Sequence, residues 1–143
     1  MKVKQISVFL ENKSGRLAKV TQVIGKNEIN IRALSIADTA DFGILRLIVN
    51  KPDEAYKILK EASFTVSATD VIAVEVGDQP GGLASVLQIL DNAKVNIEYL
   101  YAFLENSSQK ALVVFRVEQL DEALQVLSEN NITVMKGEDV YHL

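Results

Sequence analysis

The chain has 143 residues, of which 48% are apolar and 24% charged, a composition typical of a folded protein with one domain or two small ones. The absence of cysteine excludes disulfides, thiolate metal sites and cysteine nucleophiles, and the net charge of −4 argues against nucleic-acid binding. The sequence contains neither a signal-peptide pattern nor an apolar run of membrane-spanning length, so we expect a cytoplasmic protein without a membrane partner.

The first half of the chain predicts four strands and two helices. Gln5–Leu10 alternates in polarity, with Ile6, Val8 and Leu10 on one side, which predicts a half-buried strand. Glu11–Arg16 is a turn, and the apolar residues from Leu17 to Ile24 then recur at helical spacing. The remaining elements are a strand at Asn30–Ala37, a turn at Thr39–Asp41, a strand at Phe42–Val49, a helix opened by Pro52-Asp53 and a short strand at Phe64–Ala68.

The second half repeats this order with similar residues at matching positions. Val71–Val76 corresponds to the first strand, and Leu83–Leu90 corresponds to the first helix. Further matches are Asn96-Ile97 with Asn30-Ile31, Asp121-Glu122-Ala123 with Asp53-Glu54-Ala55, and Thr133-Val134 with Thr65-Val66. Agreement at a nearly constant offset indicates an internal duplication. We therefore expect two domains, residues 1–69 and 70–143, joined near Thr69-Asp70 without a flexible linker.

The order of elements in each half predicts an α+β fold. Each half is expected to form a βαββαβ ferredoxin-like unit, an antiparallel four-stranded sheet with its helices on one face. The other face also has an apolar pattern, as in Tyr99–Leu104, so we expect it to be covered by the other half or by a second chain. Alternatively, Tyr99, Tyr101 and Phe103 are ordinary core aromatics of one half. Short sheets with two apolar faces favour a homodimer.

The turn between the first strand and the first helix of each half is the main candidate for chemistry. It is Asn12-Lys13-Ser14-Gly15-Arg16-Leu17 in the first half and Asp78-Gln79-Pro80-Gly81-Gly82-Leu83 in the second. A helix N-terminus offers unpaired N–H groups to a carboxylate, glycine allows close approach, and Asp78 or Asn12 could cap the helix or accept an ammonium group. This chemistry suits a small zwitterion. Such turns also begin many helices that bind nothing, so the motif alone decides little.

Asn30 and Asn96 each open the second strand of their half. We expect the start of this strand to lie at the same end of the sheet as the turn, so that each asparagine faces it. The alternative is a purely local role, because asparagine tolerates the left-handed conformation that a helix-to-strand turn requires.

These motifs resemble the ACT domain, a family of small regulatory modules of amino-acid metabolism. The resemblance rests on the βαββαβ order, on Asp78-x-Pro80-Gly81-x-Leu83 and on Asn96-Ile97, and it covers the whole chain as two tandem copies. The first half departs from the family pattern with Asn12 in place of the acidic residue and Ser14 in place of proline. The resemblance implies a stand-alone tandem ACT protein with ligands at the strand-to-helix turn, where two ACT units meet. The residues that it assigns to ligand binding are Asn12, Ser14, Gly15, Arg16, Leu17, Asn30, Ile31, Asp78, Gln79, Pro80, Gly81, Gly82, Leu83, Asn96 and Ile97.

The resemblance favours a regulatory protein that binds a free amino acid, with an apolar or aromatic side chain as our expectation, and acts allosterically. The alternative is a regulatory subunit of a separately encoded enzyme of amino-acid metabolism, acting mainly by protein–protein contact. RNA binding is disfavoured because the third strand, Ile44–Ile48, lacks stacking aromatics. No nucleophile–base pair, metal-ligand cluster or cofactor motif is found in the sequence, and His142 is interpreted as a tail residue. We therefore expect no catalysis, cofactor or metal.

Overall fold

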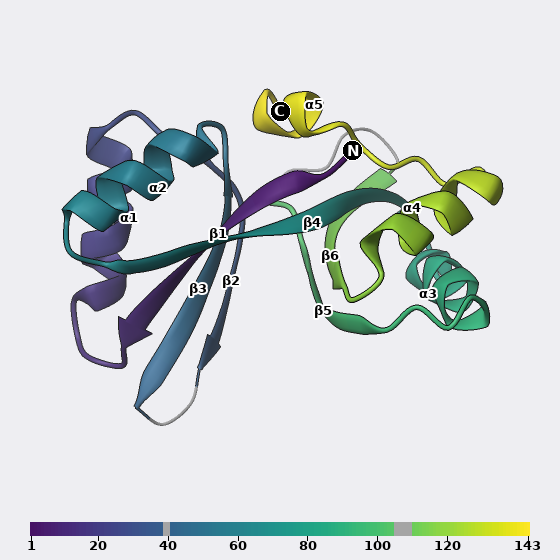
Figure 1. Cartoon of the computed structure of the whole chain (residues 1–143), viewed down its shortest axis with the longest axis horizontal. Helices are drawn as coiled ribbons and strands as arrows, with labels where there is room; N and C mark the ends of the chain where they lie inside the picture. The colour runs from purple at the N-terminus through teal and green to yellow at the C-terminus, as the bar shows by residue number, and fades with distance from the viewer. Residues whose placement is uncertain (39–40, 105–109) are drawn as a thin grey trace. The chain divides into compact units, whose positions relative to one another are not determined.

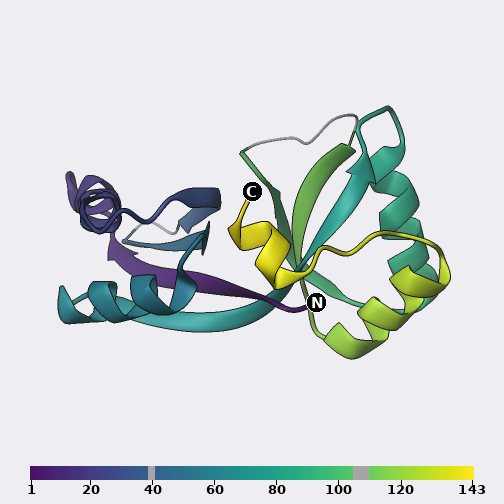
Figure 2. The same cartoon turned by 90° about the horizontal axis from the view of Figure 1, so that it is seen from above.

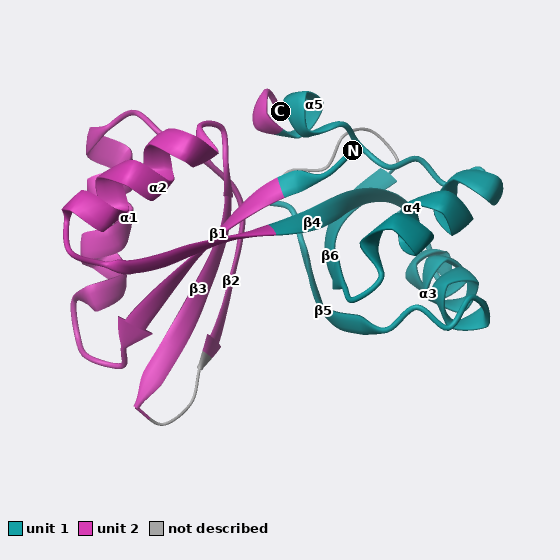
Figure 3. Ribbon diagram, in the orientation of Figure 1, with its two compact units in different colours: residues 1–3, 70–140 teal, residues 4–69, 141–143 magenta. Residues whose placement is uncertain are grey.

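The structure is a computed structural model that describes residues 1–38, 41–104 and 110–143. The chain divides into two compact units (Figure 3). Unit 2 consists of Lys4–Thr69 and Tyr141–Leu143, and unit 1 consists of Met1–Val3 and Asp70–Val140. The predicted turn at Thr39–Asp41 falls largely outside the described residues. In the described part of the chain, no helix is long and apolar enough to cross a membrane.

The first six elements follow the order predicted from the sequence (Figure 1). They are β1 (Val3–Glu11), α1 (Arg16–Lys26), β2 (Ile31–Asp38), β3 (Phe42–Val49), α2 (Pro52–Glu61) and β4 (Thr65–Gly77). In unit 2 the strand order is β2-β3-β1-β4, and both β1 and β2 pair antiparallel with β3. Helices α1 and α2 pack together on one face of this sheet, which is the ferredoxin-like arrangement.

The core of unit 2 lies between its helices and its sheet. Ile6, Val8 and Leu10 of β1 are buried there, which confirms the face predicted from their alternation. Val20 and Ile24 of α1 pack against them from the helical side. The first helical residue of α2 is Pro52, whose missing N–H has no partner to lose at that position.

Unit 1 contains the later elements in the same arrangement (Figure 2). They are α3 (Gly82–Asn92), β5 (Ile97–Ala102), β6 (Lys110–Val117), α4 (Leu120–Glu129) and α5 (Gly137–Tyr141), whose last residue belongs to unit 2. The second part of β4 pairs with β6, and β6 pairs with β5, both antiparallel. Helices α3 and α4 pack together over a core that includes Ile72, Val74 and the fully buried Phe115.

Three predicted strands differ from their predicted form. The predicted strands Phe64–Ala68 and Val71–Val76 are parts of one 13-residue strand, β4, because no residue between them breaks the extended backbone. The predicted last strand at Thr133-Val134 is reduced to one bridge, Val74 to Val134, with Met135 N–H donating to the Ala73 carbonyl at 2.8 Å. The short helix α5 follows it and has no counterpart among the predicted elements.

The three aromatic residues of the β5 region lie on the sheet face away from α3 and α4. Tyr99 pairs with Arg116 and Tyr101 with Val114, whereas the alternate residues of β6, such as Phe115, lie in the core under the helices. The two tyrosine rings stack with centroids 6.5 Å apart. Tyr101 and Phe103 are buried, so this face of the sheet is apolar.

Candidate functional site

The two strand-to-helix turns have the same backbone conformation. Gly15 and Gly81 are the N-cap residues of α1 and α3, with φ of 87° and 83°, a left-handed conformation that favours glycine. In the first turn the Lys13 N–H donates to the Glu11 carbonyl at 2.8 Å and the Arg16 N–H to the Lys13 carbonyl at 3.3 Å. The equivalent bonds of the second turn, Gln79 to Gly77 and Gly82 to Gln79, measure 2.9 and 3.0 Å. The duplication therefore extends to the φ angle of the N-cap glycine and to these two backbone hydrogen bonds.

Neither helix is capped by a side chain. The N-cap position is occupied by glycine in both cases, and no side-chain hydrogen bond is made at either N-cap among the described residues. Asp78 and Asn12, which the sequence allowed as caps, are thus not the N-cap residues of α3 and α1. The N-termini of α1 and α3 keep backbone N–H groups that can donate hydrogen bonds to a bound anion.

A pocket of about 210 Å³ lies beside the first turn. Its walls combine charged side chains from the turn with apolar side chains from the sheet and from α1. The lining residues are Leu10, Glu11, Asn12, Lys13, Arg16, Leu17, Ile36 and Gly43. Three of the residues predicted from the sequence, Asn12, Arg16 and Leu17, line this pocket. Ser14 and Gly15 lie in the turn beside it without lining it.

The pocket contains charges of both signs, and sequence reasoning missed two of them, Glu11 and Lys13. The Lys13 ammonium lies 2.9 Å from Oε2 of Glu11. The hydrogen bond from Lys13, its charge and, to a lesser extent, the charge of Arg16 lower the pKa of Glu11 below its usual value. Glu11 is therefore a carboxylate throughout the neutral range. Comparison of the two halves could have drawn attention to Glu11, because glycine stands at the equivalent position, 77.

Arg16 stands between this pocket and a neighbouring hollow of about 210 Å³ lined by Phe9, Phe42 and Phe64. Its guanidinium carbon lies 5.3 Å from the centre of the Phe64 ring, a cation–π contact. Its Nε is buried and has no hydrogen-bond partner among the described residues. Most buried donors in proteins are paired, so an unpaired N–H at this position is unusual.

The second turn differs from the first at two positions. Gly77 and Gly82 occupy the positions of Glu11 and Arg16, so this turn lacks both charged side chains. Gly82 is buried, and an added Cβ there would lie 1.9 Å from the Gly77 carbonyl oxygen. Asp78, Gln79, Pro80 and Gly81 are exposed, and Leu83 is 37% exposed.

The prediction that Asn30 and Asn96 face the turns of their own units is wrong. Strand β2 runs parallel to β1, since both pair antiparallel with β3, so β2 starts at the end where β1 also starts. The β3 residue paired with Ile31 is seven positions from the residue paired with Glu11, which is roughly 23 Å along the sheet. The register of β4, β5 and β6 places Asn96 and Ile97 in the same way in unit 1.

The backbone N–H of each asparagine instead donates a hydrogen bond to a side chain just after the end of the neighbouring strand. The Asn30 N–H donates to Asn50 Oδ1 at 2.9 Å, and the Asn96 N–H donates to Gln119 Oε1 at 3.1 Å. The local alternative is also wrong in its detail, because the left-handed residues before these strands are Glu28 and Lys94.

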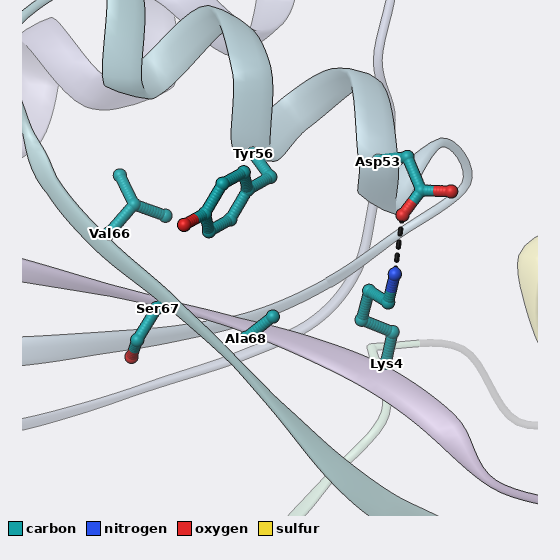
Figure 4. A pocket seen from close by; sticks show the side chains of 6 residues that line it. All are labelled: Lys4, Asp53, Tyr56, Val66, Ser67 and Ala68. Carbon is teal, nitrogen blue, oxygen red and sulfur yellow. Dashed lines mark hydrogen bonds and ion pairs between the residues drawn. The ribbon is translucent and has the colours of Figure 1, made fainter.

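A larger pocket of about 510 Å³ lies near the start of β1, between α2 and β4 (Figure 4). An ion pair between the Lys4 ammonium and Asp53 Oδ1 spans one side, and Tyr56 points toward Val66 on the other. None of the residues predicted from the sequence lines it. In the described part of the chain, no group of three acidic or histidine side chains could hold a metal ion.

Comparison with known proteins identifies the class to which this fold and these turns belong. Residues 1–143 match the family described as ACT domain pair, and the chain belongs to this family. It is similar to protein BT0572 from Bacteroides thetaiotaomicron, with 47% identity, a TM-score of 0.94 and coverage of 100% of this chain and 98% of that one.

More distant likenesses lie in the fold alone. The regulatory subunits of aspartate kinase from Thermus thermophilus and Thermus flavus are 20% and 17% identical, with TM-scores of 0.62 and 0.61. Each match covers 88% of this chain, and 91% and 90% of the respective subunit. No curated protein matches the chain. The resemblance noted in the sequence is thus confirmed at the level of family and fold.

Proposed function

We propose that this protein is a regulatory protein that binds a free amino acid at the turn between the first strand and first helix of an ACT unit. Membership of the ACT domain pair family supports a small-molecule-binding regulatory role. The observation that carries the finer proposal is the pocket beside the first turn, where Glu11, Arg16 and the N-terminus of α1 adjoin apolar walls. Ligand binding there would shift an assembly or partner equilibrium in proportion to its differential affinity for the two states.

The size and walls of the pocket indicate the kind of ligand. Sites for drug-sized molecules are roughly 300–1,000 Å³, so a pocket of about 210 Å³ suits a smaller molecule, such as one amino acid. Leu10, Leu17 and Ile36 supply an apolar wall. This combination supports the expectation of an apolar side chain on the ligand.

Four of the predicted residues cannot belong to a site at the turn of their own unit. Asn30, Ile31, Asn96 and Ile97 are too far from the turns of their own units to share a ligand with them. A site that includes them therefore needs a turn from the other unit or from a second copy of the chain, and the second case agrees with the proposed homodimer. We keep residues 1–69 and 70–143 as the two proposed ACT domains and Asp78–Leu83 as the second proposed turn.

A thermal-shift screen of the twenty amino acids tests the function. A ligand present at 100 times its dissociation constant adds about 2.7 kcal/mol to the free energy of unfolding. We expect at least one L-amino acid to raise the melting temperature and its D-enantiomer to have no effect at the same concentration. If no amino acid raises it, and an enzyme copurifies with the chain expressed in its own host, the alternative role as an enzyme's regulatory subunit replaces this proposal.

A further inference from the structure

The two turns differ at two positions that matter for ligand chemistry. Glu11 and Arg16 of the first turn correspond to Gly77 and Gly82 of the second, at the same offset as the rest of the repeat. The first turn thus carries an anion and a cation on one pocket wall, whereas the second carries neither at these positions. A pair of opposite charges beside an apolar wall is the complement of a zwitterion with an apolar side chain.

Glu11 is suited to receive the ammonium group. Its lowered pKa keeps it ionised, and its side chain is 50% exposed at the pocket. The ion pair with Lys13 engages Oε2. A carboxylate accepts hydrogen bonds on both oxygens, so Oε1 is the acceptor for the ligand.

Arg16 is suited to receive the carboxylate. A guanidinium presents five donors in a fixed fork that matches a carboxylate. The guanidinium of Arg16 lies over the ring of Phe64. The Nε of Arg16 lacks a hydrogen-bond partner among the described residues. Since Arg16 is the first residue of α1, the ligand carboxylate would also lie at the helix N-terminus, where negative charge is favoured.

We infer that each chain binds one amino acid, at the first turn, through Arg16 on its carboxylate and Glu11 on its ammonium, with an aliphatic side chain against Leu10, Leu17 and Ile36. The inference rests on the proposed function and narrows it to one turn and one ligand class. The second turn holds no equivalent ligand, because Gly77 and Gly82 bring backbone to backbone where the first turn has its two charged groups.

Isothermal titration with L-leucine tests the number of sites and the role of Arg16. We expect one leucine per chain, and a roughly ten- to hundredfold weaker binding to Arg16→Gln, the range for a lost charge-assisted hydrogen bond. Arg16→Lys, which keeps the charge, should weaken binding less. Arg32→Gln is the matched control, because Arg32 Nε is also buried without a partner among the described residues but does not line the pocket. Two leucines per chain, or equal effects of Arg16→Gln and Arg32→Gln, would overturn the inference.

Ligand analogues assign the two ends of the zwitterion independently of any effect on folding. L-Leucinamide lacks the carboxylate, so Arg16→Gln should bind it as tightly as the unchanged protein does. 4-Methylpentanoate lacks the ammonium, so Glu11→Gln should not weaken its binding further. This is the logic of a double-mutant cycle with the ligand as one partner. A tenfold effect of Arg16→Gln on leucinamide would refute the assignment.

The screen separates failure of this inference from failure of the proposed function. An aromatic or charged amino acid as the ligand in the screen, or two ligands per chain in the titration, overturns the inference and leaves the function standing. If none of the twenty binds, both are overturned.

Discussion

Gly82 lies directly against the backbone of Gly77, and a Cβ on Gly82 would be 1.9 Å from the Gly77 carbonyl oxygen and 2.9 Å from its carbonyl carbon. Real Cβ atoms do not approach backbone this closely, so the contact depends on the absence of a side chain at position 82. The equivalent residue of the first turn, Arg16, carries a long side chain without difficulty, so the two turns differ in how closely the strand end approaches the helix.

The first prediction concerns Gly82. Gly82→Ala should lower the free energy of unfolding by about 1–3 kcal/mol, because the backbone of Gly77 must move to admit the methyl group. Gly25→Ala is the control, since Gly25 lies within α1 with open space around its Cβ position. That control should raise stability by about 0.5–1 kcal/mol. Urea unfolding followed by circular dichroism measures both, and an unchanged midpoint for Gly82→Ala would contradict the predicted clash.

The second prediction concerns Gly81, where the strain is conformational. Its Cβ would meet no atom within 4 Å, but its φ of 83° lies in the left-handed region. Gly81→Ala should therefore cost about 1–2 kcal/mol, and Gly81→Asn less, because asparagine visits this conformation more readily. Thermal unfolding of the two variants gives the comparison. Equal losses would show that steric contact, and not backbone conformation, selects glycine here.

The third prediction concerns the pKa of Glu11. Lys13→Gln removes the hydrogen bond and the charge that lower it, so the pKa of Glu11 should rise toward the ordinary value of a glutamate. A carboxyl whose pKa is lowered by folding stabilises the folded state above its unfolded pKa, and this contribution is lost as pH falls through the folded pKa. NMR titration of the Glu11 carboxyl carbon measures the change. The control is Lys19→Gln, which changes another exposed lysine near this turn and should leave the pKa of Glu11 unchanged.

The fourth prediction concerns Tyr141, the last residue of α5. Its hydroxyl oxygen accepts the Lys4 N–H at 2.9 Å within unit 2. Tyr141→Phe should cost about 1 kcal/mol, since it leaves this backbone donor without its acceptor. Tyr56→Phe is the control, because the Tyr56 hydroxyl makes no hydrogen bond among the described residues. Chemical denaturation of the two variants compares them, and equal stabilities would mean that water replaces the tyrosine oxygen at no cost.

Local pattern was sufficient to predict most of the elements and the repeated unit. The alternation of Ile6, Val8 and Leu10 identifies the buried side of β1, because side chains of a strand alternate between its faces. Pro52 marks the start of α2 for an equally local reason. The last strand was harder to predict, because Thr133-Val134 matches Thr65-Val66 in sequence but forms a single bridge to Val74. How far a strand extends depends on its partner, which two matching residues do not specify.

The candidate site was predicted only in part, for reasons of topology. Asn12, Arg16 and Leu17 share a pocket because they are neighbours in sequence. Placing Asn30 required knowing that α1 returns the chain to the opposite end of the sheet, so that β2 runs parallel to β1. The fuller motif, Asp78 to Leu83, drew attention to the second turn. The close contact between Gly82 and Gly77 became visible only in the structure.

The assignment of Tyr141–Leu143 to the unit built from Lys4–Thr69 has a consequence for biosynthesis. The acceptor for the Lys4 N–H is provided by Tyr141, which the ribosome adds after the whole of α3 and α4. Domains generally fold as units during synthesis, with the N-terminal one first. Here the unit that contains most of β1 also includes residues synthesised after α3 and α4, so a ribosome stalled within the second repeat would hold a unit that still lacks Tyr141–Leu143.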